Sequence, residues 1–359
     1  MNIKFIIMKI FYQKKWKTSR VCAIIFSKLV YISISKAVIN MKIVMLDAYT
    51  TNPGDLSWDN FNKYGEVTIY DRTPADKVIE RCIDADIVIT NKTPITKDII
   101  DNLPKLKFIA LMSTGYNIVD YVYLKEKGIP VSNIPSYSTD AVSQLVLSFI
   151  LELAMNVGLH SATVKAGEWC ECKDFCYWKS PLTELTGKTL GIFGLGKIGR
   201  AVAEKAKAFG MNIVAYTHRI HGDEPEYIKL VSLDEMLAVS DVVSMHCPLT
   251  PETEGVVNEE FIAKMKDGAY FINTSRGTVV NEKALADALN SGKLGGAGLD
   301  VLSTEPPAKN NPLLTAKNCF ITPHIAWAAF ETRKRLAGIL ESNIKAFIDG
   351  NAQNVVNKQ

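Results

Sequence analysis

Short apolar segments alternate with longer stretches of mixed polarity along the chain from Met41 onward. In the first part of this region the apolar segments predict β-strands over Lys42–Leu46, Val67–Tyr70, Ile87–Thr90 and Lys107–Leu111. Continuous β-branched runs of this kind are typical of parallel strands buried on both faces. Because the stretches between them are long enough for helices, the pattern predicts a doubly wound α/β domain.

A second βαβ series follows an apolar helix predicted over Ala141–Leu153. Its strands are expected at Thr189–Phe193, Ile213–Tyr216, Val242–His246, Tyr270–Asn273, Ala297–Val301 and Phe320–Thr322. Helix starts are indicated by Ser232 with Glu235 as a capping box, and by Asn258 and Asn281 as N-caps. A helical stretch over Ala328–Ile348 is expected to end at Gly350 and to return to the first domain.

We therefore expect an α/β protein with two doubly wound parallel-sheet domains, Rossmann-like or flavodoxin-like, and an active site in the cleft between them. Residues 41–139 and 325–359 would form the substrate-binding domain, and 140–324 the dinucleotide-binding domain. Residues 1–40 are expected to be an extension outside the fold, with Met41 as the native start and a targeting arm as the alternative. No apolar run there reaches the ~20 residues of a membrane helix.

Charge and cysteine content narrow the class of protein. Residues 1–40 hold eight of the 41 Lys and Arg and no acid, which leaves 33 basic against 38 acidic residues, a charge of −5, in the remainder. That balance predicts neither a nucleic-acid nor a membrane partner. The seven cysteines lack disulfide-framework spacing, so we expect reduced thiols in the cytoplasm. Cys170, Cys172 and Cys176 lack the paired spacing of a zinc site, and no metal is predicted.

Residues 190–199 (LGIFGLGKIG) carry a glycine fingerprint at the end of a predicted strand. The first glycine permits a tight turn, the second lets the backbone approach a pyrophosphate, and the third allows close packing of the next helix. The pyrophosphate is expected at the positive end of that helix. The cofactor-binding residues predicted here are Gly194, Gly196, Lys197, Ile198 and Gly199.

The choice between NAD(H) and NADP(H) normally depends on an acid about 20 residues further on, which holds the ribose 2′-hydroxyl. Here the strand ends in Thr217-His218-Arg219, and Thr217 occupies the place of the acid. Arg219, helped by His218, could pair with a 2′-phosphate. We predict NADP(H) use or dual specificity ahead of strict NAD(H) use. The alternative is that Arg219 is a solvated loop charge.

Three side chains suit the reduction of a 2-keto acid, which needs a carboxylate clamp, a polarised carbonyl and a proton donor. Arg276 follows a predicted strand and offers a planar, permanent charge for the clamp. His324 follows the last predicted strand at the same sheet edge and can transfer a proton near neutral pH. Glu305 is its natural partner, since a carboxylate orients the imidazole and favours the charged form. A structural salt bridge and a structural histidine are the alternatives for Arg276 and His324.

Five motifs give the chain from about Met41 to its end a resemblance to the D-isomer-specific 2-hydroxyacid dehydrogenases, within them to the glycerate dehydrogenase (hydroxypyruvate reductase) branch. The motifs are Gly194-Leu-Gly-Lys-Ile-Gly199, His246-Cys-Pro-Leu-Thr-Pro-Glu-Thr253, Asn273-Thr-Ser-Arg-Gly277, Gly298-Leu-Asp-Val301 and Pro323-His-Ile-Ala-Trp327. The resemblance implies NAD(P)H-dependent reduction of hydroxypyruvate or glyoxylate to D-glycerate or glycolate, and the reverse. It also implies that Arg276, Glu305 and His324 are catalytic.

The resemblance extends to residues around the cofactor. Asp300 and Thr274 are implied to contact the nicotinamide ribose or carboxamide. Cys247 and Pro248, which follow a predicted strand, are expected to form the pocket wall near the nicotinamide or adenine. Thr253, at the end of the same motif, is counted with them.

The resemblance also concerns the substrate and the assembly. Gly115, with Thr114, would offer a backbone amide to the substrate carboxylate beside Lys92, and Trp327 is similar to the pocket aromatic of the branch. Family members form homodimers through the nucleotide domain, often with the helix that begins near Ala141. The loop Glu168–Lys179 is either a dimer contact or a substrate cover.

Other functions stay open on the sequence. A formate dehydrogenase would carry an amide in place of the acid partner of the histidine, and Glu305 argues against it. A phosphoglycerate dehydrogenase would need additional basic residues for the substrate phosphate. D-lactate or another D-2-hydroxyacid dehydrogenase remains an alternative, because pockets separate pyruvate from hydroxypyruvate only about 10²-fold. A dinucleotide-sensing, co-repressor-like binding protein on the same fold is the alternative outside the enzymes.

Overall fold

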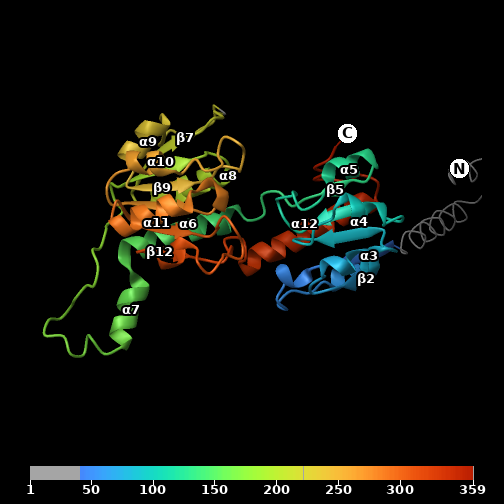
Figure 1. Cartoon of the computed structure of the whole chain (residues 1–359), viewed down its shortest axis with the longest axis horizontal. Helices are drawn as coiled ribbons and strands as arrows, with labels where there is room; N and C mark the ends of the chain where they lie inside the picture. The colour runs from blue at the N-terminus through green and yellow to red at the C-terminus, as the bar shows by residue number, and fades with distance from the viewer. Residues whose placement is uncertain (1–40, 221, 359) are drawn as a thin grey trace, which may run out of the picture. The chain divides into compact units, whose positions relative to one another are not determined.

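The computed structural model describes residues 41–220 and 222–358, which fold into two compact units (Figure 1). The first unit consists of residues 41–135 and 336–358, and the second of Ser136–Arg335. The sequence pattern places the boundaries at 139/140 and 324/325, four and eleven residues away from the observed ones. The second crossing lies inside helix α12 (Phe330–Ile348), because this helix continues from one unit into the other. The extension over residues 1–40 lies outside the described residues.

The first unit is built on a parallel five-stranded sheet with the order β2-β1-β3-β4-β5. Its strands are β1 (Met41–Met45), β2 (Gly65–Ile69), β3 (Ile87–Thr90), β4 (Phe108–Leu111) and β5 (Val131–Ser132). Its helices besides α12 are α3 (Val78–Cys82), α4 (Lys97–Asp101) and α5 (Tyr121–Glu126), with 3-10 turns η1 (Ala48–Thr50), η2 (Asp59–Tyr64) and η3 (Ala75–Lys77). All residues of β3 and β4 are buried, as expected for central parallel strands. The four strands predicted in this region are confirmed within two residues.

The edge strand β5 is not predicted by the sequence pattern, because two residues carry no periodicity. It pairs with β4 and is also contacted by the C-terminal tail. Ser132 forms an antiparallel bridge with Val355. The Asn357 side chain accepts from the Val131 amide and donates to the Ile129 carbonyl, both at 2.9 Å. The edge is therefore held by residues 226 positions apart in the sequence.

The second unit contains a parallel seven-stranded sheet with the order β12-β11-β10-β9-β6-β7-β8. Its strands are β6 (Thr189–Phe193), β7 (Asn212–Tyr216), β8 (Ile228–Leu230), β9 (Val242–Met245), β10 (Ala269–Asn273), β11 (Leu294–Leu299) and β12 (Cys319–Ile321). Its helices are α6 (Thr139–Met155), α7 (Val157–Lys165), α8 (Lys197–Ala208), α9 (Leu233–Val239), α10 (Glu259–Lys264) and α11 (Glu282–Ser291), with 3-10 turns η4 (Gly277–Val279) and η5 (Pro312–Thr315). Strand order reverses between β6 and β9, so this unit is doubly wound as predicted.

Three predicted helix starts are present with their caps. The side chains of Ser232, Asn258 and Asn281 each accept a hydrogen bond from the amide three residues further on. Such a cap satisfies one of the amides that the first helical turn leaves unpaired. The Glu235 carboxylate, which a capping box would turn back to the Ser232 amide, accepts a hydrogen bond from Lys229 instead. Only the Ser232 half of the expected capping box is therefore formed. The local sequence thus determines where these three helices begin.

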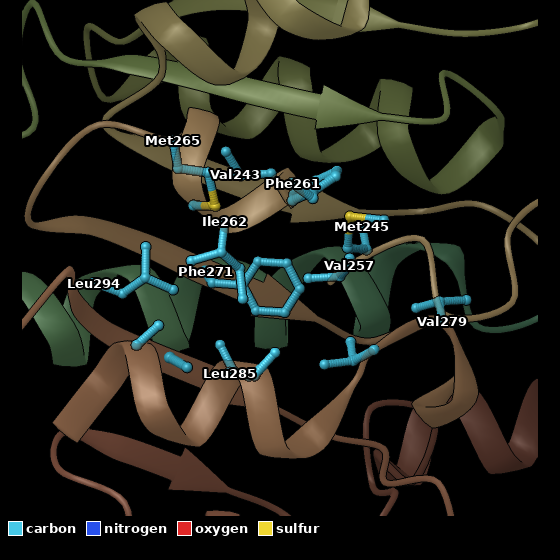
Figure 2. Close-up of a cluster of buried hydrophobic side chains, with 14 of the residues drawn as sticks. Val243, Met245, Val257, Phe261, Ile262, Met265, Phe271, Val279, Leu285 and Leu294 are labelled. Atoms are coloured by element: carbon cyan, nitrogen blue, oxygen red, sulfur yellow. The ribbon is translucent and has the colours of Figure 1, made fainter. Parts of the chain in front are cut away.

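The apolar core of the second unit includes a cluster between its sheet and two helices. Figure 2 shows Phe271 of β10 in the middle of this cluster, with Ile262 of α10 and Leu285 of α11 beside it. Phe271 and Leu285 are completely buried. Burial of such side chains contributes roughly 1.5–3 kcal/mol each, so the cluster fixes the strand β10 and the segment that follows it.

Helix α6 approaches strand β11 closely at two glycines. A Cβ at Gly298 would lie 2.5 Å from Cγ of Phe149, and one at Gly296 would lie 2.4 Å from a δ-carbon of Leu153. The predicted strand Ala297–Val301 is wrong at its start, because β11 begins at Leu294. Glycines weaken the strand signal in the sequence, yet here they give the helix room to pack.

Helix α7 and the loop that follows it extend away from the sheet of the second unit (Figure 1). No residue of α7 is buried. Apolar side chains are exposed along this segment, at Val157, Leu159, Trp169, Phe175 and Trp178. This segment, residues 157–182, is called the arm below.

Two further observations concern metals and membranes. Cys170, Cys172 and Cys176 on the arm are free thiols. In the described ranges, no three His, Cys, Asp or Glu side chains are grouped so that they could hold a metal ion. Among the described helices, none alone is long and apolar enough to cross a membrane. Helices α6 and α7 meet that criterion only as a pair bent by 56°.

Candidate active site

The strands of the second sheet are all parallel, so the segments that follow them meet at one edge, the carboxyl edge. Along this edge the sheet order places His324 after β12, Asp300 after β11, Arg276 after β10, His246 after β9, Gly194 after β6 and Thr217 after β7. The reversal of strand order falls between β9 and β6. Open α/β sheets bind ligands at such a reversal. Here it separates the predicted catalytic residues from those predicted to select the cofactor.

The glycine turn after β6 has the shape that a dinucleotide needs. Gly194 has a φ of +99°, and a Cβ there would lie 2.9 Å from the His246 carbonyl group. A Cβ at Gly199 would lie 2.3 Å from the Gly194 carbonyl oxygen, so the helix packs closely on the turn. Gly196 faces open space and precedes the first turn of α8. The residues present therefore fit a pyrophosphate at the helix N-terminus.

The two other fingerprint residues also serve the fold. Lys197 donates from Nζ to the Ser136 hydroxyl at 2.8 Å. The half-buried Ile198 packs against the apolar core. Both lie in the first turn of α8, where backbone amides have no partner within the helix. Those amides suit the predicted contact with phosphate oxygens.

The end of β7 presents polar side chains without an acid. The Thr217 hydroxyl donates to the Arg219 carbonyl at 3.2 Å and accepts from its amide at 3.4 Å. The His218 ring lies edge-on to Tyr216, with Nε2 3.3 Å from the phenol oxygen. His218 and Arg219 are exposed. This strand end therefore offers a cation and an imidazole to a ligand.

Arg276 is exposed in the segment after β10, and its backbone is held by the buried Asn273. Asn273 donates from Nδ2 to the Arg276 carbonyl at 2.9 Å and accepts from the amide and hydroxyl of Ser275 at 2.9 and 2.8 Å. Thr274 lies between Asn273 and Ser275 in the sequence. Its buried hydroxyl oxygen has no hydrogen-bond partner in the structure. Buried polar groups are normally paired. An orphaned hydroxyl at this edge fits the predicted contact with the nicotinamide part of a dinucleotide.

A close backbone approach at Gly277 brings Arg276 beside the segment that carries Glu305. A Cβ at Gly277 would lie 1.9 Å from the carbonyl carbon of Leu302 and 2.4 Å from the Ser303 nitrogen. The Glu305 carboxylate accepts from the Leu302 amide at 3.1 Å. Because no side chain can occupy position 277, the two segments lie directly against one another.

His324 pairs with Glu305, as predicted. The distance from His324 Nδ1 to Glu305 Oε2 is 2.7 Å, and the two side chains are 37% and 38% exposed. An imidazole oriented through Nδ1 leaves Nε2 available for proton exchange with a ligand. The pair therefore has the geometry of an oriented proton donor.

The loop that carries His324 is held by hydrogen bonds to the Asp300 carboxylate. His324 has a φ of +55°, an uncommon conformation for a residue other than glycine. Asp300 accepts from the Thr322 hydroxyl at 2.6 Å and from the amides of Ile325 and Ala326 at 2.8 Å. Burial raises the pKa of Asp300, which is 1% exposed. Asp300 thus supports the histidine loop, and its implied contact with the nicotinamide remains a prediction.

The loop after β9 is buried in part and held by internal hydrogen bonds. Burial lowers the pKa of His246 to about 4, so this imidazole is neutral at neutral pH. Burial raises the pKa of the Cys247 thiol, which is likewise uncharged. Thr253 accepts from the Thr250 amide at 2.8 Å and donates to the Pro248 carbonyl at 2.7 Å. These bonds fix the loop in which Cys247 and Pro248 were expected to line the pocket.

The predicted substrate-binding residues of the first unit follow β3 and β4. Lys92 is exposed. The Thr114 hydroxyl donates to the Ile134 carbonyl, and the Gly115 carbonyl accepts from the Ser113 hydroxyl, both at 2.7 Å. Trp327, in the second unit, is half-buried three residues after His324.

Asn273 and Gly277 are positions that reasoning from the sequence did not assign. Asn273 is a completely buried polar residue at the end of a strand, and Gly277 directly follows Arg276. Both belong to the motif Asn273-Thr-Ser-Arg-Gly277. An amide at the end of a buried strand and a glycine beside a charged residue were the available signals.

A dinucleotide turn beside an oriented histidine and an exposed arginine is the arrangement of a nicotinamide-dependent oxidoreductase. Residues 147–326 match the family model described as D-isomer specific 2-hydroxyacid dehydrogenase, NAD binding domain. The chain belongs to this family. It is an NAD(P)-dependent oxidoreductase of the D-2-hydroxyacid type.

Similar proteins extend the match to both units. The chain is 51% identical over 322 residues to a hydroxypyruvate reductase of Blautia hydrogenotrophica, covering 89% of this chain and 100% of that protein. It is 38% identical to a glycerate dehydrogenase of Methylorubrum extorquens, covering 88% and 98% of the two chains. The structure of D-lactate dehydrogenase from Aquifex aeolicus with NAD and lactic acid is similar with a TM-score of 0.72 at 30% identity, covering 89% and 99%.

Proposed function

We propose that this protein reduces hydroxypyruvate or glyoxylate to D-glycerate or glycolate with NAD(P)H, and that it catalyses the reverse reaction. The observation that carries the proposal is the 2.7 Å pairing of His324 with Glu305, at the sheet edge that also bears Arg276 and the glycine turn. The similarity to a hydroxypyruvate reductase and a glycerate dehydrogenase supports this substrate class.

The proposed roles follow from the chemistry of three side chains. The Arg276 guanidinium is a planar, permanent cation, so it holds the substrate carboxylate and polarises the keto oxygen. When bound, the nicotinamide supplies the hydride that adds to the carbonyl carbon. His324 donates its Nε2 proton to the keto oxygen as charge develops there. Glu305 stabilises the imidazolium before the transfer and keeps the ring oriented.

Further residues have supporting roles in the proposal. Lys92, with the Gly115 amide and Thr114, binds the substrate carboxylate, and Trp327 lines the substrate pocket. Thr274 contacts the nicotinamide ribose or carboxamide through its unpaired hydroxyl. Asp300 holds the histidine loop and reaches the same part of the cofactor.

The proposed cofactor preference is NADP(H) or dual use. The end of β7 supports this preference, because His218 and Arg219 are exposed there and residues 217–219 contain no carboxylate to repel a 2′-phosphate. A guanidinium pairs with a phosphate through two charge-assisted hydrogen bonds.

The direct test follows the loss of nicotinamide absorbance with hydroxypyruvate, glyoxylate and pyruvate, each with NADPH and NADH. We expect the highest kcat/KM with hydroxypyruvate, and a value with NADPH at least equal to that with NADH. Oxidation of D-glycerate but not L-glycerate is the control for stereochemistry. Absence of turnover with all three keto acids, together with tight dinucleotide binding, would overturn the proposal in favour of a binding protein.

We also propose that the protein is a cytoplasmic homodimer whose chains meet through the arm. The exposed apolar side chains of the arm support this contact, above all Phe175, which is 89% exposed. Helix α6, the helix expected from the sequence, buries Val146 and Ile150 completely within its own unit and has less apolar surface to offer. Free thiols among the described cysteines are typical of a reducing compartment.

A further inference from the structure

Asp47 is a buried acid in the first unit that has no role in the steps above. It follows β1 and is only 3% exposed. Strands β1 and β3 are parallel neighbours with Met45 opposite Ile89, so Asp47 lies beside the residues that follow β3. That loop, residues 90–93, contains Lys92.

The Asp47 carboxylate accepts hydrogen bonds from three consecutive amides of this loop. Oδ1 accepts from the Asn91 amide at 2.8 Å, and Oδ2 accepts from the amides of Lys92 and Thr93 at 2.6 and 2.8 Å. The hydroxyls of Thr93 and Thr90 lie 3.1 and 3.3 Å from Oδ2. The three backbone amides can only donate, so a carboxylate satisfies all three, whereas a group that carries its own N–H leaves at least one of them unpaired.

A second set of bonds ties the same loop to the turn after β1. Asn91 donates from Nδ2 to the Thr50 hydroxyl at 2.9 Å, and that hydroxyl donates to the Asp47 carbonyl at 2.7 Å. The backbone on both sides of Lys92 is therefore fixed to the segment that follows β1.

The arrangement has a consequence for anion binding. Successive backbone amides that converge on one point form an anion site. Here the chain fills that site with its own carboxylate, so these amides are already engaged. The exposed Lys92 ammonium remains as the group of this loop that can meet a substrate anion.

We propose that Asp47 is a positioning residue for substrate binding: it locks the backbone of residues 91–93 so that Lys92 meets the substrate carboxylate from a fixed base. This inference rests on the proposed function, in which Lys92 binds that carboxylate. A lysine on a fixed backbone loses less conformational freedom when it binds than one on a loose loop.

The test compares Asp47→Asn with the unaltered chain. The amide turns an N–H toward the loop donors, so we expect the KM for hydroxypyruvate to rise about tenfold, the effect of losing a charge-assisted hydrogen bond. Neither kcat at saturation nor the KM for the dinucleotide should change. Asp86→Asn is the matched control, because Asp86 accepts the Lys42 amide at 2.9 Å from just before β3, at the opposite edge of the same sheet.

A double-mutant cycle with Lys92→Ala separates positioning from general destabilisation. If Asp47 acts through Lys92, then Asp47→Asn should change KM little in the Lys92→Ala background. Hydrogen exchange of residues 91–93 should also become faster in Asp47→Asn, and not in Asp86→Asn. If the fold-change in KM of the double variant equals the product of the two single fold-changes, the proposal is overturned, because Asp47 would then act independently of Lys92.

Three further outcomes concern the folding of Asp47→Asn, its KM and the activity of the unaltered chain. If Asp47→Asn does not fold, Thr93→Val removes one donor and leaves the carboxylate in place; an unchanged KM for hydroxypyruvate in that variant would overturn the proposal. If folded Asp47→Asn shows normal turnover and an unchanged KM for hydroxypyruvate, the positioning role of Asp47 is contradicted, whereas the proposed function stands. Absence of turnover in the unaltered chain contradicts the proposed function, and the positioning role falls with it.

Discussion

Single residues of the candidate site are held by buried polar groups at strand ends. Asn273 holds the backbone of Arg276, Asp300 holds the loop of His324, and Asp47 holds the loop of Lys92. Each holding residue is almost completely buried, whereas each held side chain is more exposed. A buried polar group must find its partners inside the fold. The backbone beneath the exposed functional groups is thereby constrained.

Replacement of the histidine tests the proposed proton donor. His324→Ala should lower kcat by about 10³-fold, the usual contribution of a general acid, while leaving the Kd for NADPH unchanged. Steady-state kinetics and a fluorescence titration of NADPH measure the two effects. Glu305→Gln keeps the shape of the partner and should lower kcat less. Equal losses in turnover and in cofactor binding would show that His324 has a structural role instead.

Among the elements, two close approaches occur where a glycine removes the side chain. Helix α6 packs on β11 in this way at Gly298, and the segment after β10 meets the Leu302 backbone at Gly277. The first approach seats the long core helix, and the second places Arg276 beside the segment of Glu305. The packing of α6 and the assembly of the site therefore both depend on a glycine that allows a close approach.

A pair of glycine substitutions tests this reading of the packing. In Gly298→Ala the new Cβ would lie 2.5 Å from Phe149, so we expect a loss of about 1–3 kcal/mol in the free energy of unfolding. Gly338→Ala is the control, since Gly338 lies within α12 with no atom near its Cβ position. That change should stabilise the helix by about 0.5–1 kcal/mol. Urea midpoints that move in the same direction for both variants would contradict the argument.

The whole molecule consists of two units, each with its own parallel sheet and its own buried core. The chain crosses between them at 135/136 and within α12. The arm differs from both cores, because its side chains Trp169, Phe175 and Trp178 are exposed rather than packed. Large exposed apolar side chains gathered on one segment are typical of a protein–protein contact.

The proposed homodimer is tested by adding charge to the arm. The double change Phe175→Asp and Trp178→Asp should shift the mass in sedimentation equilibrium from that of two chains to that of one, because burying unpaired carboxylates in an apolar contact is unfavourable. Phe209→Asp is the control, since Phe209 is an exposed aromatic outside the arm. If the double variant keeps the mass of two chains, the contact lies elsewhere.

The sequence by itself determined the elements and the kinds of chemistry. Buried β-branched runs specified most strands, Ser232, Asn258 and Asn281 specified helix starts, and the glycine fingerprint marked the dinucleotide turn. These features depend on residues that are close in the sequence, so periodicity and local hydrogen bonding reveal them. The family resemblance was readable for the same reason, since its motifs are continuous segments.

Only the tertiary structure decided which of these segments meet. The contact of Gly277 with Leu302 and the hydrogen bonds of Asp47 to the loop of Lys92 join separate segments that nothing in the sequence linked. The tail that completes β5 pairs with residues 226 positions away. Such contacts follow from the order and register of strands in a sheet, and no local periodicity encodes them. The candidate residues were therefore visible in the sequence, whereas the bonds by which Asn273, Asp300 and Asp47 hold them in place were visible only in the fold.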